Sequence, residues 1–244
     1  MDRLVNYEIV KNTEINSTTY LMELKGPTSW IKSGKFLNIG VPGKYLRRPM
    51  SIYDWNKNSL KVLYKVIGEG TKILSRMQPK QRLEILIDLG NYYVPFKDKK
   101  QLIVCGGCGM GSVYSLARQL TKNKIDVTIV IGFKSKLDVF TLQEWKSVCK
   151  QLIVCTDDGS YGFKGNVVDA IKKYGLDNLP YYTCGSINLM KAVFKACKSE
   201  GQLSLEARMG CGFGACMGCS IETKHGPKRV CREGTIFSSK ELLW

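Results

Sequence analysis

Four cysteines near the C-terminal end have a spacing that can bind a metal cluster. Three of them lie in the stretch "GCGFGACMGC", and the fourth follows after "SIETKHGPKRV". The pattern is C-x4-C-x2-C…C, which is the spacing of plant-type [2Fe–2S] centres, where each of two irons takes two thiolates. The glycines between them allow the backbone to wrap closely and to aim amide groups at sulfur. The predicted cluster ligands are Cys211, Cys216, Cys219 and Cys231.

A structural zinc site is the alternative interpretation of these cysteines, because C-x2-C pairs are common zinc ligands. Zinc ribbons usually carry two separated C-x2-C pairs, whereas this chain has one close triplet and a single distant cysteine. The spacing therefore favours an iron–sulfur cluster. A basic zinc-binding module that contacts nucleic acid remains the alternative from another functional class.

A glycine-rich turn, "CGGCGMGS", follows the apolar run "QLIVC" and precedes a stretch of helical pattern. In a strand–turn–helix setting, such glycines let a pyrophosphate approach the backbone at the N-terminus of a helix. The turn therefore predicts a nucleotide site. Cys105 and Cys108 in the same turn also form C-x-x-C, which leaves a redox dithiol open. The predicted nucleotide-binding glycines are Gly106, Gly107, Gly109 and Gly111.

A third candidate site is the segment "LRRPMSIYDW" at residues 46–55. Arg47 and Arg48 could bind a phosphate through their guanidinium groups, and Ser51 could donate a hydrogen bond to a flavin. Taken alone, the segment is more often a solvated turn than a binding site. A nicotinamide transfers electrons in pairs and a [2Fe–2S] cluster transfers them singly, so a chain that holds both needs a flavin, which can do both.

The pattern of apolar residues divides the 244-residue chain into three parts. Residues 1–98 show short alternating strands such as "SLKVLYKVIGEG" and "RLEILIDLG", which predict an antiparallel β-barrel; the resemblance given below implies that it binds FAD. Residues 99–203 alternate apolar strands with amphipathic helices, which predicts a parallel α/β domain; the same resemblance implies that it binds NAD. The repeated "KQLIVC" at 100–105 and 150–155 is interpreted as two buried parallel strands. Residues 204–244 form the predicted [2Fe–2S] domain.

Charge and composition set limits on partners and location. The chain has 37 Lys and Arg against 21 Asp and Glu, but the basic residues are scattered and are not interleaved with stacking aromatics. We therefore predict no nucleic-acid partner. No apolar run is long enough to span a membrane, and the first residues lack an export pattern, so a cytoplasmic protein is expected. His225, the single histidine, falls in a predicted hairpin turn, which excludes a Ser-His-Asp hydrolase.

Taken together, the three parts resemble the ferredoxin–NADP reductase-like proteins. They are most similar to the electron-transfer subunits of class 1B, NAD-dependent dihydroorotate dehydrogenases. The resemblance covers nearly the whole chain. Its marks are "RRPMSI", "LYKVIGEGTKILS", "CGGCGMGS", "TDDGSYGFKG", "YYTCGS", "SLEARMGCGFGACMGC" and "RVCREGTIF".

The resemblance implies an oxidoreductase subunit of pyrimidine biosynthesis, with FAD, a [2Fe–2S] cluster and NAD as cofactors and no acid–base catalytic residue on this chain. Its partner would be an FMN-containing dihydroorotate dehydrogenase catalytic subunit, in an α2β2 heterotetramer. A related ferredoxin reductase or sulfide dehydrogenase subunit remains the alternative, and Lys134, Ser135 and Lys136 leave NADP open. The implied FAD residues are Arg48, Pro49, Met50, Ser51, Leu63, Tyr64, Lys65, Gly70 and Thr71. Cys184 and Gly185 join the glycine turn at the implied NAD site.

Overall fold

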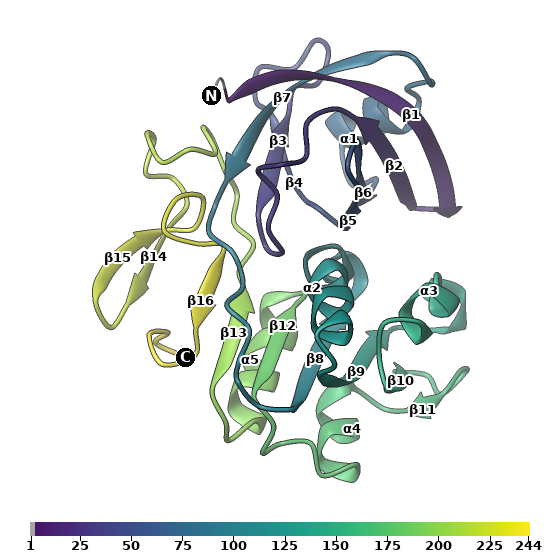
Figure 1. The fold of residues 1–244 in the computed structure, drawn as a ribbon, viewed down its shortest axis with the longest axis vertical. Helices are drawn as coiled ribbons and strands as arrows, with labels where there is room; N and C mark the ends of the chain where they lie inside the picture. The colour runs from purple at the N-terminus through teal and green to yellow at the C-terminus, as the bar shows by residue number, and fades with distance from the viewer. Residues whose placement is uncertain (1–2) are drawn as a thin grey trace.

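A computed structural model describes residues 3–244 and contains two large β-sheets, one above the other in Figure 1. The first is a seven-stranded antiparallel sheet in the order β4-β3-β7-β1-β2-β6-β5. It curls until β4 approaches β6, which makes the predicted barrel. Its strands are β1 (Leu4–Asn16), β2 (Thr19–Lys25), β3 (Phe36–Ile39), β4 (Arg48–Ser51), β5 (Asp54–Trp55), β6 (Ser59–Lys65) and β7 (Arg82–Leu89).

Alternation of apolar residues determines which side of each barrel strand is buried. In β6, Leu60, Val62 and Tyr64 point into the barrel core, whereas Leu63 packs on the lower domain and Lys65 is exposed. The prediction for this strand is confirmed. Helix α1 (Glu69–Ser75) was not expected among the strands. It is short, and Pro79 and several polar residues close behind it conceal its periodicity at the sequence level.

The second sheet has the order β11-β10-β9-β8-β12-β13-β16 and is parallel except for β16. Both copies of "KQLIVC" form strands of this sheet, on either side of β9, as predicted. The fold class of a β-barrel followed by a parallel α/β unit is therefore confirmed. The strands are β8 (Lys100–Gly106), β9 (Asp126–Phe133), β10 (Gln151–Thr156), β11 (Phe163–Lys164), β12 (Tyr181–Cys184), β13 (Gly201–Ser204) and β16 (Ile236–Ser238).

Helices cover both faces of the parallel sheet. The face next to the barrel carries α2 (Met110–Lys122) and α3 (Leu142–Lys146), and the other face carries α4 (Val167–Lys173) and α5 (Ile187–Ala196). Single 3₁₀ turns, η1 (Gly107–Gly109) and η2 (Lys136–Asp138), follow β8 and β9. The stretch 137–149 has the apolar pattern of a helix, but within it only Leu142–Lys146 is α-helical. None of the helices in residues 3–244 is long and apolar enough to cross a membrane.

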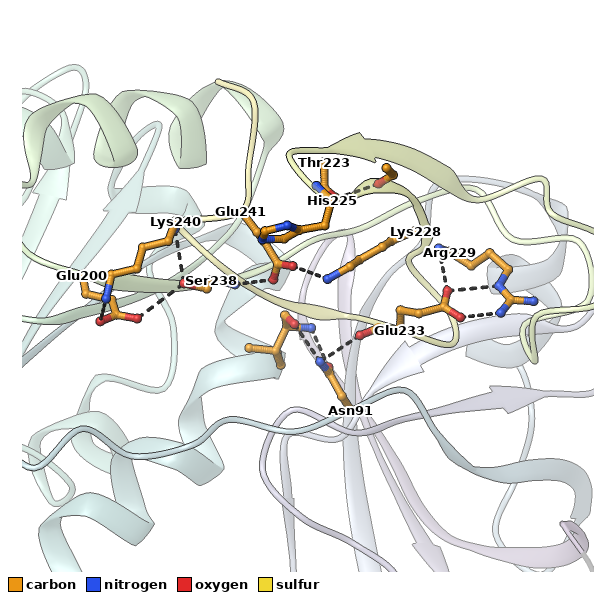
Figure 2. Close-up of polar contacts among 12 residues, drawn as sticks. Asn91, Glu200, Thr223, His225, Lys228, Arg229, Glu233, Ser238, Lys240 and Glu241 are labelled. Carbon is orange, nitrogen blue, oxygen red and sulfur yellow. Dashed lines mark hydrogen bonds and ion pairs between the residues drawn. The ribbon is translucent and has the colours of Figure 1, made fainter.

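The C-terminal segment packs against both larger parts. Its hairpin, β14 (Ser220–Thr223) and β15 (Gly226–Arg229), lies at the left of Figure 1, and β16 joins the parallel sheet beside β13. Asn91, after the last barrel strand, donates to the carbonyls of Glu233 and Ile236 at 3.1 and 2.7 Å and accepts from the N–H of Ile236 at 2.8 Å (Figure 2). These hydrogen bonds hold the C-terminal segment against the chain at the point where it leaves the barrel.

Candidate functional site

The glycine turn and the "CGS" segment meet at the centre of the parallel sheet. The chain runs outward from β8 to β10 on one side and from β12 to β13 on the other, so the turns after β8 and β12 flank a topological switch point. A Cβ at Gly109 would lie 2.3 Å from the Cys184 carbonyl oxygen and 2.6 Å from the Gly185 nitrogen. These two predicted site segments are therefore in direct backbone contact.

A cleft of about 720 Å³ opens above this junction. That volume suits a cofactor-sized ligand. The barrel supplies one wall through the β1–β2 turn and Lys65. The carboxyl ends of β8, β9, β10 and β12, together with residues of α4 and α5, supply the other walls. Of the predicted cofactor residues, Lys65, Gly106, Gly107, Gly109 and Gly185 line it.

The far end of the cleft carries both signs of charge. Lys134, which was predicted from the sequence as a potential phosphate contact, lines it together with Asp138 and Asp157. Ser135 instead caps η2 by accepting from the N–H of Leu137, and the Lys136 backbone donates to Ser160 at 2.7 Å. The loops after β9 and β10 therefore form one hydrogen-bonded rim.

Thiols in this region are poorly suited to redox exchange. Cys105 and Cys184 are fully buried neighbours on paired strands, and burial raises the pKa of each well above its usual value. Cys108 lines the cleft, and burial raises its pKa to about 11. Because the thiolate is the reactive species, a dithiol exchange at Cys105 and Cys108 is not favoured by this environment.

Arg48 lies beside the first turn of α1. A Cβ at Gly70 would meet its Nε at 2.4 Å, so two predicted flavin residues from different segments are packed together, and a side chain at position 70 would displace the guanidinium. The guanidinium also donates to the carbonyl of Leu46 at 2.5 Å. A cation at a turn with free backbone amides is suited to binding phosphate. Arg47, in contrast, is paired with Glu84.

Strand β4 also faces the nucleotide domain. A Cβ at Gly111 in α2 would lie 3.7 Å from Leu63 and 3.9 Å from Ser51, so the barrel and the glycine turn approach each other here. Pro49 and Met50 lie between Arg48 and Ser51 on the same half-buried strand.

Two predicted flavin residues have side chains that are used elsewhere. Tyr64 points into the barrel core, is 3% exposed and donates to Asn12 Oδ1 at 3.0 Å. Thr71 Oγ1 accepts from the backbone N–H of Ile67 and of Gly68 and so caps α1. Tyr64 and Thr71 can therefore contact a ligand only through their backbone groups, because their side chains are engaged within the barrel and the helix cap.

A polar and aromatic contact holds the two larger parts in this arrangement. Tyr53 stacks on Tyr114 of α2 with ring centroids 4.3 Å apart, and its hydroxyl donates to Glu144 at 2.8 Å. Asp54 pairs with Arg118 at 2.7 Å. The walls of the cleft are thus joined by contacts of the barrel with one face of α2 and with α3.

The four C-terminal cysteines come together as two pairs. Cys211 Sγ accepts from the backbone N–H of Cys216 at 3.4 Å, and the N–H of Cys211 points to Cys216 Sγ at 3.5 Å. The N–H of Cys231 donates to Cys219 Sγ at 3.4 Å. Across residues 3–244, no three His, Cys, Asp or Glu side chains converge as ligands of one ion. Two pairs match the donor set of a binuclear cluster, which takes two thiolates on each iron.

Electrostatics differ between these pairs. Partial burial raises the pKa of Cys211, but hydrogen bonds from the backbone of Cys216, Phe213 and Ala215 outweigh it and bring the pKa down to about 6. Burial, with the neighbouring Cys219, raises the pKa of Cys231 to about 12. A metal ligand must be deprotonated, and the loop amides already favour the thiolate at Cys211.

Asn38 is a contact of the cluster loop that sequence reasoning missed. It is 1% exposed on barrel strand β3, and its Nδ2 donates to the carbonyl of Cys211 at 3.2 Å. Gly212 has a φ of +78°, and a Cβ there would meet the same amide at 2.4 Å, so glycine is required. An asparagine in an apolar strand was the available signal, because a buried amide needs a partner.

Comparison with known proteins identifies the family. The iron–sulfur cluster binding domain of dihydroorotate dehydrogenase B matches residues 206–243. The dihydroorotate dehydrogenase B (NAD(+)) electron transfer subunit of Fusobacterium nucleatum is 35% identical, with 96% of each chain covered. That of Streptococcus mutans is 36% identical, over 98% of this chain and 97% of the relative. The chain belongs to this family of electron transfer subunits.

Solved structures agree with that membership. An NADH-dependent reduced ferredoxin–NADP oxidoreductase superimposes on the family member described here with a TM-score of 0.89 and 26% identity, covering 98% of this chain and 90% of that one. A ferredoxin–NADP+ reductase from Neisseria gonorrhoeae, solved with FAD and NADP, has a TM-score of 0.70 at 14% identity, covering 80% of this chain and 91% of that one. The latter likeness shows the fold alone. The expected resemblance to reductases of this type is confirmed.

Proposed function

We propose that this chain carries electrons from an FMN-containing dihydroorotate dehydrogenase catalytic subunit, by way of a [2Fe–2S] cluster and FAD, to NAD+. One observation carries the proposal: barrel strands β3 and β4 lie between the two other sites. Asn38 of β3 contacts the cysteine loop, and Ser51 of β4 faces Gly111 of the nucleotide turn. A flavin site on β4 would therefore stand between cluster and nucleotide.

The bound groups would supply complementary chemistry: a nicotinamide exchanges hydride, a [2Fe–2S] cluster exchanges single electrons, and a flavin does both. The residues of this chain bind and orient them. Arg48 and the Gly70 turn offer a cation and backbone amides for the FAD pyrophosphate. The α2 N-terminus, preceded by Gly109, offers backbone amides at the NAD site.

We assign the four cysteines as the cluster ligands, Cys211 with Cys216 and Cys219 with Cys231. The loop amides donate to sulfur, and the buried position of Cys219 and Cys231 shields that half from water. No side chain of this chain is assigned a proton-transfer role. Residues 1–98, 99–203 and 204–244 serve as the FAD, NAD and cluster parts, with β16 binding the last to the second.

Docking of the catalytic subunit is assigned to the cysteine loop, in an α2β2 complex. Phe213 and Met217 are 47% and 53% exposed on either side of the exposed Cys216. Apolar side chains beside an electron-transfer group are suited to a protein interface. Trp244 packs on Phe194 of α5, with ring centroids 5.9 Å apart. Ten free cysteines in the described chain suit a reducing cytoplasm.

The test is anaerobic co-expression with an FMN-type dihydroorotate dehydrogenase subunit, followed by assay of dihydroorotate-dependent NAD+ reduction. We expect the chains to co-purify, and Cys216→Ser to lower both this activity and the iron content at least about tenfold. Cys197→Ser is the matched control, because Cys197 is half-buried at the other end of the sheet. A colourless protein that holds zinc would refute the cluster assignment and favour the zinc-module alternative.

A related NADH-dependent ferredoxin reductase subunit remains the second candidate, and the superposition with such an enzyme at 26% identity favours it specifically. It predicts a yellow-brown chain that oxidises NADH but neither binds the dihydroorotate dehydrogenase subunit nor couples to it. NADP in place of NAD is tested by comparing kcat/KM for the two nucleotides.

A further inference from the structure

Arg229, on strand β15, contacts the cysteine loop from outside the predicted ligand set. Its Nη1 donates to the carbonyl oxygen of Gly214 at 2.7 Å. Its Nε donates to Glu233 Oε2 at 3.0 Å, its Nη2 pairs with Glu233 Oε1, and its backbone N–H donates to the same carboxylate at 2.8 Å (Figure 2). Side chain and main chain are therefore both fixed, which holds the guanidinium against the loop.

The hydrogen bond to Gly214 acts on a peptide group that also contacts a cluster thiol. The carbonyl of Gly214 and the N–H of Ala215 belong to one planar peptide unit. That N–H donates to Cys211 Sγ at 3.2 Å. Arg229 at the oxygen end therefore fixes the plane that aims the N–H at sulfur, and hydrogen bonds connected in this way polarise one another. Gly214 has a φ of +95°, so this plane depends on such a contact more than a non-glycine peptide would.

The charge of Arg229 also reaches the second thiol pair. In the hairpin, Arg229 pairs with Ser220, the residue after Cys219, and it lies two residues before Cys231 in the chain. Reduction adds negative charge to an iron–sulfur cluster, and nearby positive charge and hydrogen bonds to sulfur stabilise the reduced form. Both effects of this arginine therefore act in the same direction on the reduction potential.

We propose that Arg229 is a positioning residue that raises the reduction potential of the cluster, by orienting the Gly214–Ala215 peptide toward Cys211 and by placing a cation against the cysteine loop. The inference rests on the proposed function in one respect, namely that the four cysteines bind an iron–sulfur cluster. It concerns how this chain sets the reduction potential of the cluster.

The test is a reductive titration of the anaerobically purified, cluster-loaded chain, followed by electron paramagnetic resonance. We expect Arg229→Gln to shift the midpoint potential negatively and Arg229→Lys, which keeps the charge but loses the forked geometry, to shift it less. Resonance Raman spectra of both variants should show altered Fe–S(Cys) stretching frequencies. Lys228→Gln is the matched control, because Lys228 is the preceding residue on β15 but pairs with Glu241 (Figure 2). It should leave the potential and the spectrum unchanged.

An Arg229→Gln chain with wild-type iron and sulfide content and an unchanged potential would overturn the inference. So would a Lys228→Gln shift as large as that of Arg229→Gln, since any surface cation would then have the same effect. If Arg229→Gln does not fold, the test rests on Arg229→Lys. A midpoint potential and a Raman spectrum of Arg229→Lys that equal those of the wild type would then refute the positioning role. Absence of iron and sulfide from the wild-type chain would instead refute the proposed function.

Discussion

Replacing Gly109 by alanine should separate the two segments that build the nucleotide site. The new Cβ would lie 2.3 Å from the Cys184 carbonyl oxygen, whereas real Cβ atoms essentially never come within 3.0 Å of another heavy atom. The glycine turn and the end of β12 must therefore move apart by about 0.7 Å, the difference between these distances. Overpacking of this kind costs about 1–3 kcal/mol. For a chain of this length, that lowers the melting temperature by about 2–12 °C.

The substitution should weaken nucleotide binding as well as stability. The amides that would bind the pyrophosphate move with the turn, so we expect the affinity for NADH to fall at least about tenfold, which corresponds to about 1.4 kcal/mol. Affinity is measured from the dependence of the rate of anaerobic flavin bleaching on NADH concentration, as the concentration that gives half the maximal rate. Stability is measured by thermal unfolding of the same samples.

Gly175→Ala is the matched control. Gly175 follows α4 at a φ of +63°, and among the described residues no heavy atom outside its chain neighbours lies within 4 Å of the position that a Cβ would take there. It should lose about 1 kcal/mol of stability from the left-handed backbone alone, with unchanged NADH affinity. If Gly109→Ala binds NADH as the wild type does and unfolds at the same temperature, the steric argument for the site is wrong.

Two further predictions concern the buried polar groups. Tyr182→Phe should lower the free energy of unfolding by about 1–3 kcal/mol. The substitution leaves Gln101 Oε1 and the Phe96 N–H, which lie 2.8 and 2.9 Å from the hydroxyl, without a buried partner. A loss of less than about 0.5 kcal/mol in chemical denaturation would contradict this. Burial raises the pKa of Asp54 above 3.8 even though Arg118 lowers it, so the stability contributed by this carboxyl is complete below pH 3.8 and is lost as the pH rises through the raised pKa. The stability of Asp54→Asn relative to the wild type should therefore increase as the pH rises from 3.8 through the raised pKa of Asp54. Denaturation at several pH values measures this, and a difference that does not change with pH would refute the direction of the shift.

Much of the fold followed from local patterns. Alternating apolar residues predicted β6 and β7, because a strand that is buried on one face has an apolar residue at every second position. The alternation of apolar strands with amphipathic helices predicted the parallel sheet. The short helices α1 and α3 were harder, since seven or five residues do not complete enough turns to show a period.

The site residues also fall into two groups, those that a local motif predicted and those that only the tertiary structure revealed. Spacing identified the four cysteines as a set, but which thiols pair was decided by how the loop folds back on the hairpin. Arg48 was visible as a candidate phosphate ligand, whereas the side chain of Tyr64 turned out to point into the barrel. Asn38 belongs to no motif, and Arg229 lies in "RVCREGTIF" without any local sign of its role, since each contacts a loop that is distant in the chain.

By itself, the sequence determined the classes of chemistry this protein can hold: a C-x4-C-x2-C…C cluster loop, a glycine turn between strand and helix, and an arginine beside a barrel strand. These signals are local, because ligand spacing and turn conformation depend on neighbouring residues. The tertiary structure alone decided that the barrel stands between the nucleotide turn and the cluster loop. That arrangement depends on packing between distant segments, Gly109 on Cys184 and Asn38 on Cys211, and such contacts have no period in the chain.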